Sequence, residues 1–419
     1  MSDEKIIPDA ALVPNEPDKK PSGFNVFLEE IRKNSLTVTF LAILTGLLIG
    51  GFIAVTTAEG VYSAFGTSIG AGFQEVWRVL VVTYSSLFQG AFGNPADIAA
   101  AFRSGDAQKI NLALTPIGES LVQSTPYILA GLAVALGFRV GLFNIGAEGQ
   151  IFVGALGAVF IGTQVHGLPP LRHAGLAFLF GGLCGGLWGF VPGFLKAKTG
   201  AHEVIITIMM NYIAFRLSEY LLSSFLKDPA KAHPISAMID KSAEIPRFFP
   251  SPNRFHLGFF IALILAFLTY ILLFKTTWGF RLRTVGLNQS AARYAGINIV
   301  WNIVLAMVLS GMLAGFAGAN EVLAVNRNLG VAFSSGYGFD SIALALLGNS
   351  HPFGVVLASL LFGFLRNGAI RMQLNAGIPI DIVSIMQAAI LAFIAAPGII
   401  RTLYRLKEPS NDQPRNSSH

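Results

Sequence analysis

The chain has 419 residues, of which 53% are hydrophobic and only 12% are charged, and its mean hydropathy is +0.61. Soluble globular domains carry about 25% charged residues, so this composition excludes an ordinary soluble domain and predicts a surface that mostly faces lipid. The net charge of +6 does not indicate nucleic-acid binding, because the cations lie in loops beside apolar segments rather than along one solvated face. The single cysteine, Cys184, excludes an intramolecular disulfide and a cysteine-based zinc site.

The chain begins with a polar segment that contains several prolines and lacks the plan of a cleaved signal peptide. Arg32 and Lys33, just before the first apolar segment, favour a cytoplasmic N-terminus. We predict a polar cytoplasmic tail over residues 1–35, one transmembrane domain over 36–403 and a second polar cytoplasmic tail over 404–419.

Apolar segments long enough to cross a membrane, which takes about 20 residues, follow one another along the chain. The predicted spans are residues 36–56, 116–137, 141–165, 174–195, 203–225, 257–274, 299–325, 339–349, 353–370 and 380–400. The span at 116–137 is predicted to begin at Pro116, since proline favours the first turn of a helix. Residues 69–90 contain Glu75 and Arg78 and predict an amphipathic helix at the membrane interface, with a true span as the alternative.

These segments predict an all-α fold, a polytopic transmembrane bundle of about ten spans. Residues 141–165 follow the preceding span after a very short gap, and residues 339–349 are short for a span. Both features indicate broken or re-entrant helices. Glycine-rich runs at 181–189 and 311–320 predict close helix packing, with hinge motion as the alternative.

The loop at 275–296 carries Lys275, Arg281, Arg283 and Arg293 and no acidic residue. A short cationic loop between two spans is typical of the cytoplasmic side. This loop also reads as a short helix whose small residues would let another protein pack closely, as a membrane subunit moved by a cytoplasmic partner requires.

Other cations fit this orientation less well. The loop at 227–254 would lie outside although it holds five cations, and Arg366 and Arg371 would lie near the outer face. Eight or nine spans are therefore the alternative count.

The motifs of several enzyme classes are missing from the sequence. It contains no H-E-x-x-H or G-x-S-x-G, and no G-x-x-x-x-G-K-[ST], so ATP hydrolysis by the P-loop route must come from another chain. We predict no catalytic residue, no metal site and no cofactor.

Polar side chains inside apolar segments are costly and mark candidate functional positions. The candidates for a translocation path are Asn144, Glu148, Gln150, Asn211 and Gln387. The first three lie among glycines that would break a helix, and broken helices at membrane depth line cavities. The alternative for Asn144 and Glu148 is helix capping, and for Asn211 it is a helix–helix contact.

Other polar residues have simpler interpretations. Glu203, Asp340 and Asp381 each stand near the start of a predicted span, where a negative charge favours the helix dipole. Glu321 and Asn326 follow a glycine-rich run near the outer end of a span, which favours a structural or gating role.

Four segments together carry a family resemblance: GLFNIGAEGQ (141–150), HEVIITIMMNYIA (202–214), GFRLRTVGLNQSAARYAGI (279–297) and SSGYGFDSIALALLGNSHPFG (334–354). With them the chain resembles permease subunits of bacterial ABC importers, in the superfamily of branched-chain amino acid and ribose permeases. Within that superfamily it is most similar to nucleoside permeases. The resemblance covers about residues 116–400, and we assign no role to 58–115.

The resemblance implies a multi-pass protein of the bacterial inner membrane that forms the path for a nucleoside. It implies an ABC ATP-binding subunit, a second permease subunit and an extracytoplasmic substrate-binding protein as partners, with membrane lipid around the chain and no nucleic acid. The segment matching the family's coupling element contains Trp278, Gly279, Arg281, Arg283, Gly286, Asn288, Ala292 and Gly296.

Alternatives of other classes are open. The same machine could carry a simple sugar or a branched-chain amino acid. A stand-alone secondary transporter would need ion-coupling carboxylates at mid-membrane, for which Glu148 is the one candidate. A membrane enzyme would need a catalytic set that the sequence lacks.

Overall fold

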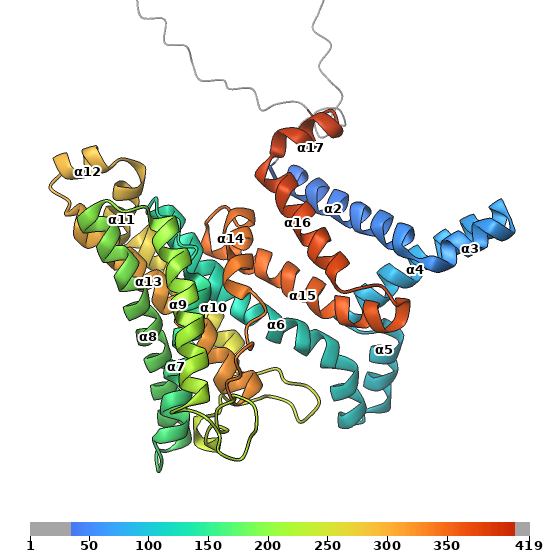
Figure 1. Cartoon of the computed structure of the whole chain (residues 1–419). Coiled ribbons are helices and arrows are strands. Elements are labelled where there is room, and N and C mark those ends of the chain that lie inside the picture. Colours follow the sequence, from blue (N-terminus) through green and yellow to red (C-terminus); the bar gives the residue numbers. More distant parts are fainter. Residues whose placement is uncertain (1–34, 407–419) are drawn as a thin grey trace, which may run out of the picture.

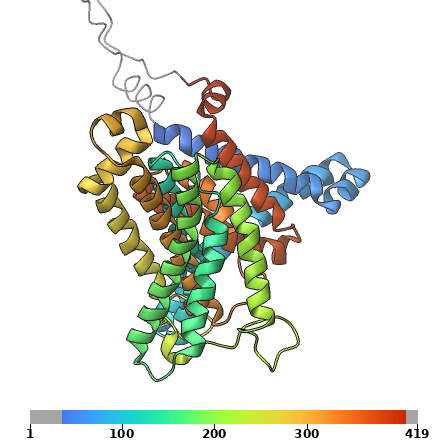
Figure 2. The ribbon, with the colours of Figure 1, turned by 60° about the vertical axis from the view of Figure 1, so that its left-hand side comes forward.

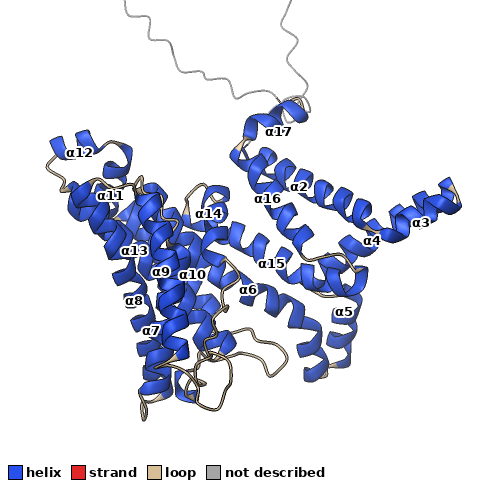
Figure 3. Ribbon diagram, viewed as in Figure 1, coloured by secondary structure: helices blue, strands red, loops and turns tan. Residues whose placement is uncertain are grey.

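The computed structural model describes residues 35–406, and within them the fold is helical (Figure 3). The first helices are α2 (Ser35–Thr57), α3 (Glu59–Thr67), α4 (Ile69–Phe92), α5 (Pro95–Ser104), α6 (Ala107–Arg139), α7 (Ala147–Gln164), α8 (Pro170–Thr199) and α9 (Glu203–Ser223). They are followed by α10 (Gly258–Lys275), α11 (Thr277–Leu287), α12 (Gln289–Tyr294), α13 (Ile299–Asn320), α14 (Tyr337–Leu347), α15 (Pro352–Ala376), α16 (Asp381–Ala395) and α17 (Pro397–Leu403). Short turns lie at η1 (Lys241–Ala243) and at the π-helix η2 (Glu321–Asn326).

Seven of the described helices are long and apolar enough to cross a membrane, and eight if α16 and α17, which meet at 91°, form one bent span. The all-α polytopic class is confirmed. The expected count of about ten spans is approximate, because it also includes two helices beyond these eight. These are the 18-residue α7, which falls outside the seven, and the 11-residue α14. The tails predicted over 1–35 and 404–419 lie almost wholly outside the described residues.

Helices α7 to α13 form an upright bundle on one side, and α2 to α5 with α16 lie on the other (Figures 1 and 2). Buried apolar side chains divide in the same way. One large core joins α6 to α10 with α13 to α15, and a smaller core joins α2, α4, α15 and α16. Helices α6 and α15 pack against each other between the two groups.

The two ends of the upright bundle differ. We call the end that carries α11 and α12 the α12 end, and the opposite end, which carries residues 224–257, the loop end. Helix α6 begins near the loop end and reaches the α12 end at Arg139 (Figure 1).

The predicted start of the second span was wrong. Helix α6 begins at Ala107, nine residues before Pro116, and contains both Pro116 and Pro126. The Asp106 side chain accepts hydrogen bonds from the backbone N–H groups of Gln108 and Lys109 and so fixes the true N-terminus. A strong cap before a polar first turn therefore outweighs the preference of proline for the start of a helix.

The glycine-rich runs pack helices together, as predicted. A side chain at Gly154 of α7 would meet the backbone of Gly315 in α13, and one at Gly185 of α8 would meet the carbonyl of Gly311. Backbone contacts this close pack α7, α8 and α13 tightly together.

Candidate functional site

The chain between α6 and α7 is broken at the segment that the sequence singled out. Asn144 lies in this break, and its Oδ1 accepts a hydrogen bond from the backbone N–H of Gly146 at 3.0 Å. Its Nδ2 donates to Gln150 Oε1 at 2.9 Å and to Ser310 Oγ of α13 at 2.8 Å. Asn144 and Gln150 are fully buried. Together they replace the backbone hydrogen bonds that a continuous helix would have made.

Asn211 of α9 supports the same break from the other side. Its Oδ1 accepts from the backbone N–H of Gly149 at 2.8 Å, and its Nδ2 donates to the carbonyl of Ile145 at 3.0 Å. Gly149 packs directly on Asn211, because an added Cβ would lie 2.8 Å from that oxygen. The structure thus brings three of the predicted path residues, Asn144, Gln150 and Asn211, to the same break in the chain.

Glu148, the fourth predicted residue, joins α7 to α14. It is 2% exposed, and its two oxygens accept hydrogen bonds from Ser334 Oγ at 2.5 Å and from the backbone N–H of Gly338 at 2.6 Å. Gly338 lies so close to the backbone of Glu148 that a side chain there would clash. The carboxylate therefore holds the N-terminus of α14 against the start of α7.

Helix α14 carries one wall of a polar cavity of about 490 Å³ that it shares with α15 and α16. Asp340, Arg366 and Gln387 line it, together with the rings of Phe339 and Phe362. Gln387, the fifth predicted residue, faces this cavity and is separate from the Asn144 network. Cavities of this kind, with aromatic walls and a few convergent polar groups, are typical of small-molecule sites.

Asp340 has a side-chain contact in addition to the predicted interaction with the helix dipole. Its Oδ2 accepts a hydrogen bond from Tyr127 Oη of α6 at 2.9 Å. Arg366 lines the same cavity, and its signal in the sequence is a charge inside an apolar segment. The sequence analysis considered Arg366 only for topology, so it did not predict that Arg366 and Asp340 line one cavity.

A second polar cluster lies at the loop end. Arg254 Nε donates to both carboxylate oxygens of Glu119 at 3.1 and 3.0 Å, and this hydrogen bond raises the pKa of the guanidinium. Arg247 donates to the carbonyls of Ala324 and Val325, which the π-helix η2 leaves open. Two of the five cations of the 227–254 loop, Arg247 and Arg254, are thus bound within the protein.

The structure also shows why residues 321–326 were hard to interpret from sequence. They form the π-helix, a geometry that often marks functional positions. Glu321 is 5% exposed, while the buried side chains of Asn320 and His256 have no hydrogen-bond partner among the described residues. Burial, and then the charges of Arg247 and Arg254, lower the pKa of His256 to about 3.

The predicted coupling segment forms two short helices, α11 and α12, that project beyond the bundle (Figure 1). Thr276 caps α11 and Asn288 caps α12 through hydrogen bonds to backbone N–H groups. Gly296 ends the segment with a positive φ of 74°. The segment therefore forms two short helices where the sequence predicted one.

The residues predicted in this segment divide into a buried set and an exposed set. Gly279 and Ala292 are buried, and Gly286 lies against the backbone of Arg139 and Val140 at the end of α6. Arg283 stacks on Phe274, with its Cζ 5.1 Å from the ring centroid. These residues seat α11 on the bundle.

The exposed surface of this segment carries four large apolar or aromatic side chains among polar ones. Trp278 is 53% exposed, Phe280 59%, Leu287 87% and Tyr294 97%, and Arg281 is exposed beside them. Phe280, Leu287 and Tyr294 were missed by the sequence reasoning, which gave weight to cations and small residues. Large apolar side chains in a segment with caps and cations at both ends would have been the signal.

Comparison with known proteins adds to this geometry. Residues 117–395 match the family described as the permease component of branched-chain amino acid transport systems. The guanosine ABC transporter permease protein NupP of Bacillus subtilis is 40% identical over 376 residues, which cover 88% of this chain and 96% of that protein. The nucleoside ABC transporter permease protein NupB of Lactococcus lactis is 32% identical over 89% of this chain and 94% of that protein.

A third relative carries a different name. The glucose ABC transporter permease protein TsgB13 of Haloferax volcanii is 34% identical over 72% of this chain and 82% of that protein. No solved structure matches the chain.

Proposed function

Because the chain belongs to the family of permease components of branched-chain amino acid transport systems, we propose that it forms the translocation path for a nucleoside in an ATP-binding cassette importer. It is a multi-pass protein of the bacterial inner membrane and a transport subunit rather than a catalyst. The single observation that carries the choice of substrate is the 40% identity to a guanosine permease over nearly the whole length of both chains.

The polar cavity between α14, α15 and α16 supports this substrate class. Phe339 and Phe362 offer aromatic faces to a planar base, and Gln387 offers an amide to its hydrogen-bonding edge. Asp340 and Arg366 supply one negative and one positive charge, so the lining suits a neutral ligand with both donors and acceptors.

We propose that this cavity is part of the path and that Gln387 contacts the substrate. Asn144, Glu148, Gln150 and Asn211 are buried in this conformation, with each exposed by 2% or less. They border the path through the break and through the link to α14, and they reach the substrate only when these helices separate during transport.

The surface at the α12 end supports one of the proposed partners. We propose that an ABC ATP-binding subunit docks on α11 and α12, with the exposed Trp278, Leu287 and Tyr294 entering its surface. Gly286 and Arg283 then transmit the movement to α6 and α10, on which they pack. A second permease subunit and an extracytoplasmic binding protein complete the importer.

The chain's division into tails and membrane domain is part of the same proposal. The transmembrane permease domain extends over 36–403, between two polar cytoplasmic tails. This orientation places the α12 end in the cytoplasm, where its cations Lys275, Arg281 and Arg293 agree with the positive-inside rule.

A simple sugar is the second candidate substrate, because the glucose permease relative is 34% identical over 72% of the chain. The two are distinguished by purifying the chain with its partners from detergent and measuring ATPase activity in the presence of the binding protein. We expect stimulation by guanosine and none by glucose. Stimulation by glucose alone would replace the nucleoside with a sugar, and a chain that transports without any ATPase would overturn the importer.

A further inference from the structure

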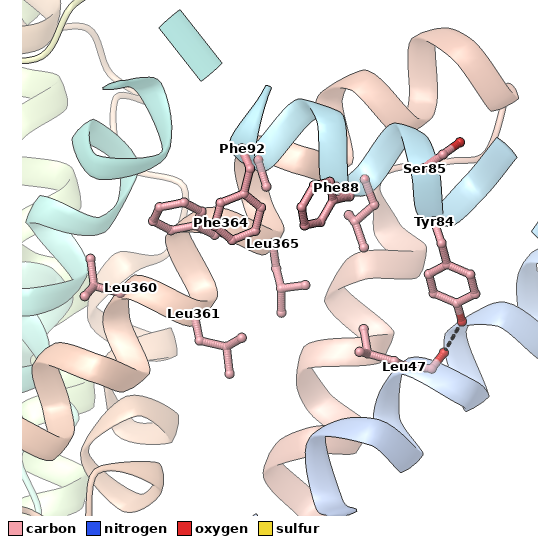
Figure 4. Close-up of a pocket in the computed structure, with 11 residues that line it drawn as sticks. Leu47, Tyr84, Ser85, Phe88, Phe92, Leu360, Leu361, Phe364 and Leu365 are labelled. Carbon is pink, nitrogen blue, oxygen red and sulfur yellow. Dashed lines mark hydrogen bonds between the residues drawn. The ribbon is translucent and has the colours of Figure 1, made fainter. Parts of the chain in front are cut away.

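An apolar crevice of about 750 Å³ lies between α2, α4 and α15, away from the polar cavity described above. In Figure 4 the side chains of Leu361 and Leu365 project into it from α15, and Leu47 borders it from α2. The rings of Phe92 and Phe364 lie against each other at one end, with centroids 4.6 Å apart. The crevice is open to the outside of the helices, and two of the helices that line it, α2 and α15, are long and apolar enough to cross a membrane.

The few polar groups at this crevice need no ligand. Tyr84 Oη donates to the carbonyl of Leu47 at 2.6 Å, as the dashed line in Figure 4 shows. Ser85 Oγ donates to the carbonyl of Val82 at 3.3 Å. An occupant therefore has to be apolar along its whole length here, since any polar group would lose its hydrogen bonds to water without replacement.

A second cavity, of about 490 Å³ and polar, follows at the end of α4. Lys109 of α6, Arg371 of α15 and Asp97 of α5 line it. Neither cation forms an ion pair with any residue that the structure describes. Two cations and one carboxylate leave this cavity with a net charge of plus one.

The two cavities continue along the same pair of helices. Phe92, the last residue of α4, lines the apolar crevice, and the next residue, Gly93, lines this second cavity. On α15, Leu360, Phe364 and Arg371 stand at i, i+4 and i+11, so they share one face over about three turns. Asn111, near the start of α6, donates a hydrogen bond to the carbonyl of Pro250 in the loop at 224–257. The second cavity therefore lies toward the loop end, where α5 also lies (Figure 1).

We propose that this crevice and cavity bind one phospholipid of net charge minus one in the leaflet at the loop end. An acyl chain lies in the crevice beside Leu361, and the phosphodiester lies between Lys109 and Arg371. Asp97 accepts hydrogen bonds from hydroxyl groups of the headgroup. A net charge of plus one complements such a lipid, whereas the ammonium of a zwitterionic headgroup would face two cations.

Other occupants fit fewer of these observations. A helix of another subunit would fill the apolar crevice but would leave Lys109 and Arg371 without a counter-charge. A free phosphate would satisfy the cations but would leave the crevice unfilled. One molecule with a charged head and an apolar chain accounts for both cavities.

The test is lipid retention by the full chain after extraction from vesicles of equimolar phosphatidylglycerol and phosphatidylethanolamine, measured by native mass spectrometry. We expect one phosphatidylglycerol retained per chain. The double variant K109Q/R371Q should retain at least about tenfold less, because each cation near a membrane surface contributes a factor of about five toward anionic lipid. The matched control is R103Q, which removes an exposed cation from the last turn of α5 that lines neither cavity.

A second variant tests the apolar half. Leu361→Trp places an indole in the crevice and should lower retention of phosphatidylglycerol while leaving the size-exclusion profile of the chain unchanged. Should L361W fail to fold, the K109Q/R371Q comparison decides alone. Equal retention of the two lipids, or equal retention by K109Q/R371Q and R103Q, would overturn the proposal.

Discussion

Single buried polar residues hold the candidate site in shape, and each does so through partners far away in sequence. Asn144 reaches Ser310, Asn211 reaches Ile145 and Glu148 reaches Ser334. Since Asn144, Asn211, Glu148 and Ser310 are buried, removing one partner leaves the other without water to replace it. Substitutions of these residues should therefore affect folding and transport together, unlike substitutions in the polar cavity between α14, α15 and α16.

The carboxylate of Glu148 offers the sharpest test at this scale. In Glu148→Gln one acceptor oxygen is replaced by an amide donor, so either Ser334 Oγ or the backbone N–H of Gly338 loses its acceptor. Hydrogen bonds to a charged group are worth about 1.5–3 kcal/mol. We expect the free energy of unfolding to fall by an amount of that order, with reduced uptake. The control Glu219→Gln breaks an exposed pair with Arg216 and should cost less than about 0.5 kcal/mol. Equal stability of the two variants would contradict the link between α7 and α14.

His256 predicts a dependence of stability on pH. Burial and two neighbouring cations lower its pKa to about 3 in the folded chain, while the ordinary histidine pKa is about 6.5. Above pH 6.5 the ring is neutral in both folded and unfolded chains and contributes nothing to the pH dependence. Below it only the unfolded chain binds the proton, so stability falls as the pH drops from 6.5 toward 3.

The measurement is the thermal unfolding midpoint in detergent at several pH values. The parent chain should lose stability between pH 6.5 and 4, and His256→Leu, which has no titratable ring, should lose less. A steeper loss in the variant than in the parent would show that other groups cause the effect.

At the scale of helices, packing depends on where glycine allows two backbones to meet. Gly185 and Gly175 both lie in α8, but a Cβ at Gly185 would meet the Gly311 carbonyl, while one at Gly175 would meet open space. We expect Gly185→Ala to lower stability by about 1–3 kcal/mol through overpacking. Gly175→Ala should leave stability unchanged or raise it slightly, because alanine favours helices. Thermal unfolding of the pair checks this, and a similar midpoint for both would mean that α8 and α13 adjust freely.

The α11–α12 segment should respond differently at its two faces. Leu287→Ser and Tyr294→Ala change side chains that are 87% and 97% exposed, so the chain should fold while stimulation of the partner ATPase by substrate falls at least about tenfold. In Gly286→Ala the new methyl carbon would lie 2.5 Å from the Arg139 carbonyl oxygen, so the chain itself should lose stability. Uptake and ATPase assays beside thermal unfolding separate these outcomes. Full coupling in both exposed-face variants would remove the docking role.

Sequence patterns predicted most of these elements because hydrophobic length and cap residues act locally. The break at Asn144 and the helices at 277–294 follow from glycines and caps that lie within a few residues. The π-helix at η2 and the Asp340–Tyr127 contact could not be predicted in this way. Both depend on neighbours such as Arg247 and Tyr127 that are brought together only by the fold.

For the whole molecule, loop charge predicts orientation, and the structure accounts for two of the five loop cations that fit this prediction less well. Arg254 and Arg247 lie on a loop that is predicted to be outside, where cations are not expected. Arg254 binds Glu119, and Arg247 binds backbone carbonyls of η2. Arg366 and Arg371 line two separate cavities. Cations bound in this way weigh less against the positive-inside rule, so we predict from the cations of the α12 end that this end is cytoplasmic.

This orientation is testable because the chain has a single cysteine. Replacing Cys184 by Ala gives a background without thiols, into which Tyr294→Cys at the α12 end or Lys231→Cys in the exposed loop is introduced. Lys231→Cys should react with a membrane-impermeant maleimide in cells whose outer barriers are opened, and Tyr294→Cys only after the inner membrane is permeabilised. Both positions are exposed, so a difference in labelling reports the side of the membrane rather than burial. Labelling of Tyr294→Cys before permeabilisation would invert the topology, and the cationic face of α11 and α12 could not then dock an ATPase in the cytoplasm.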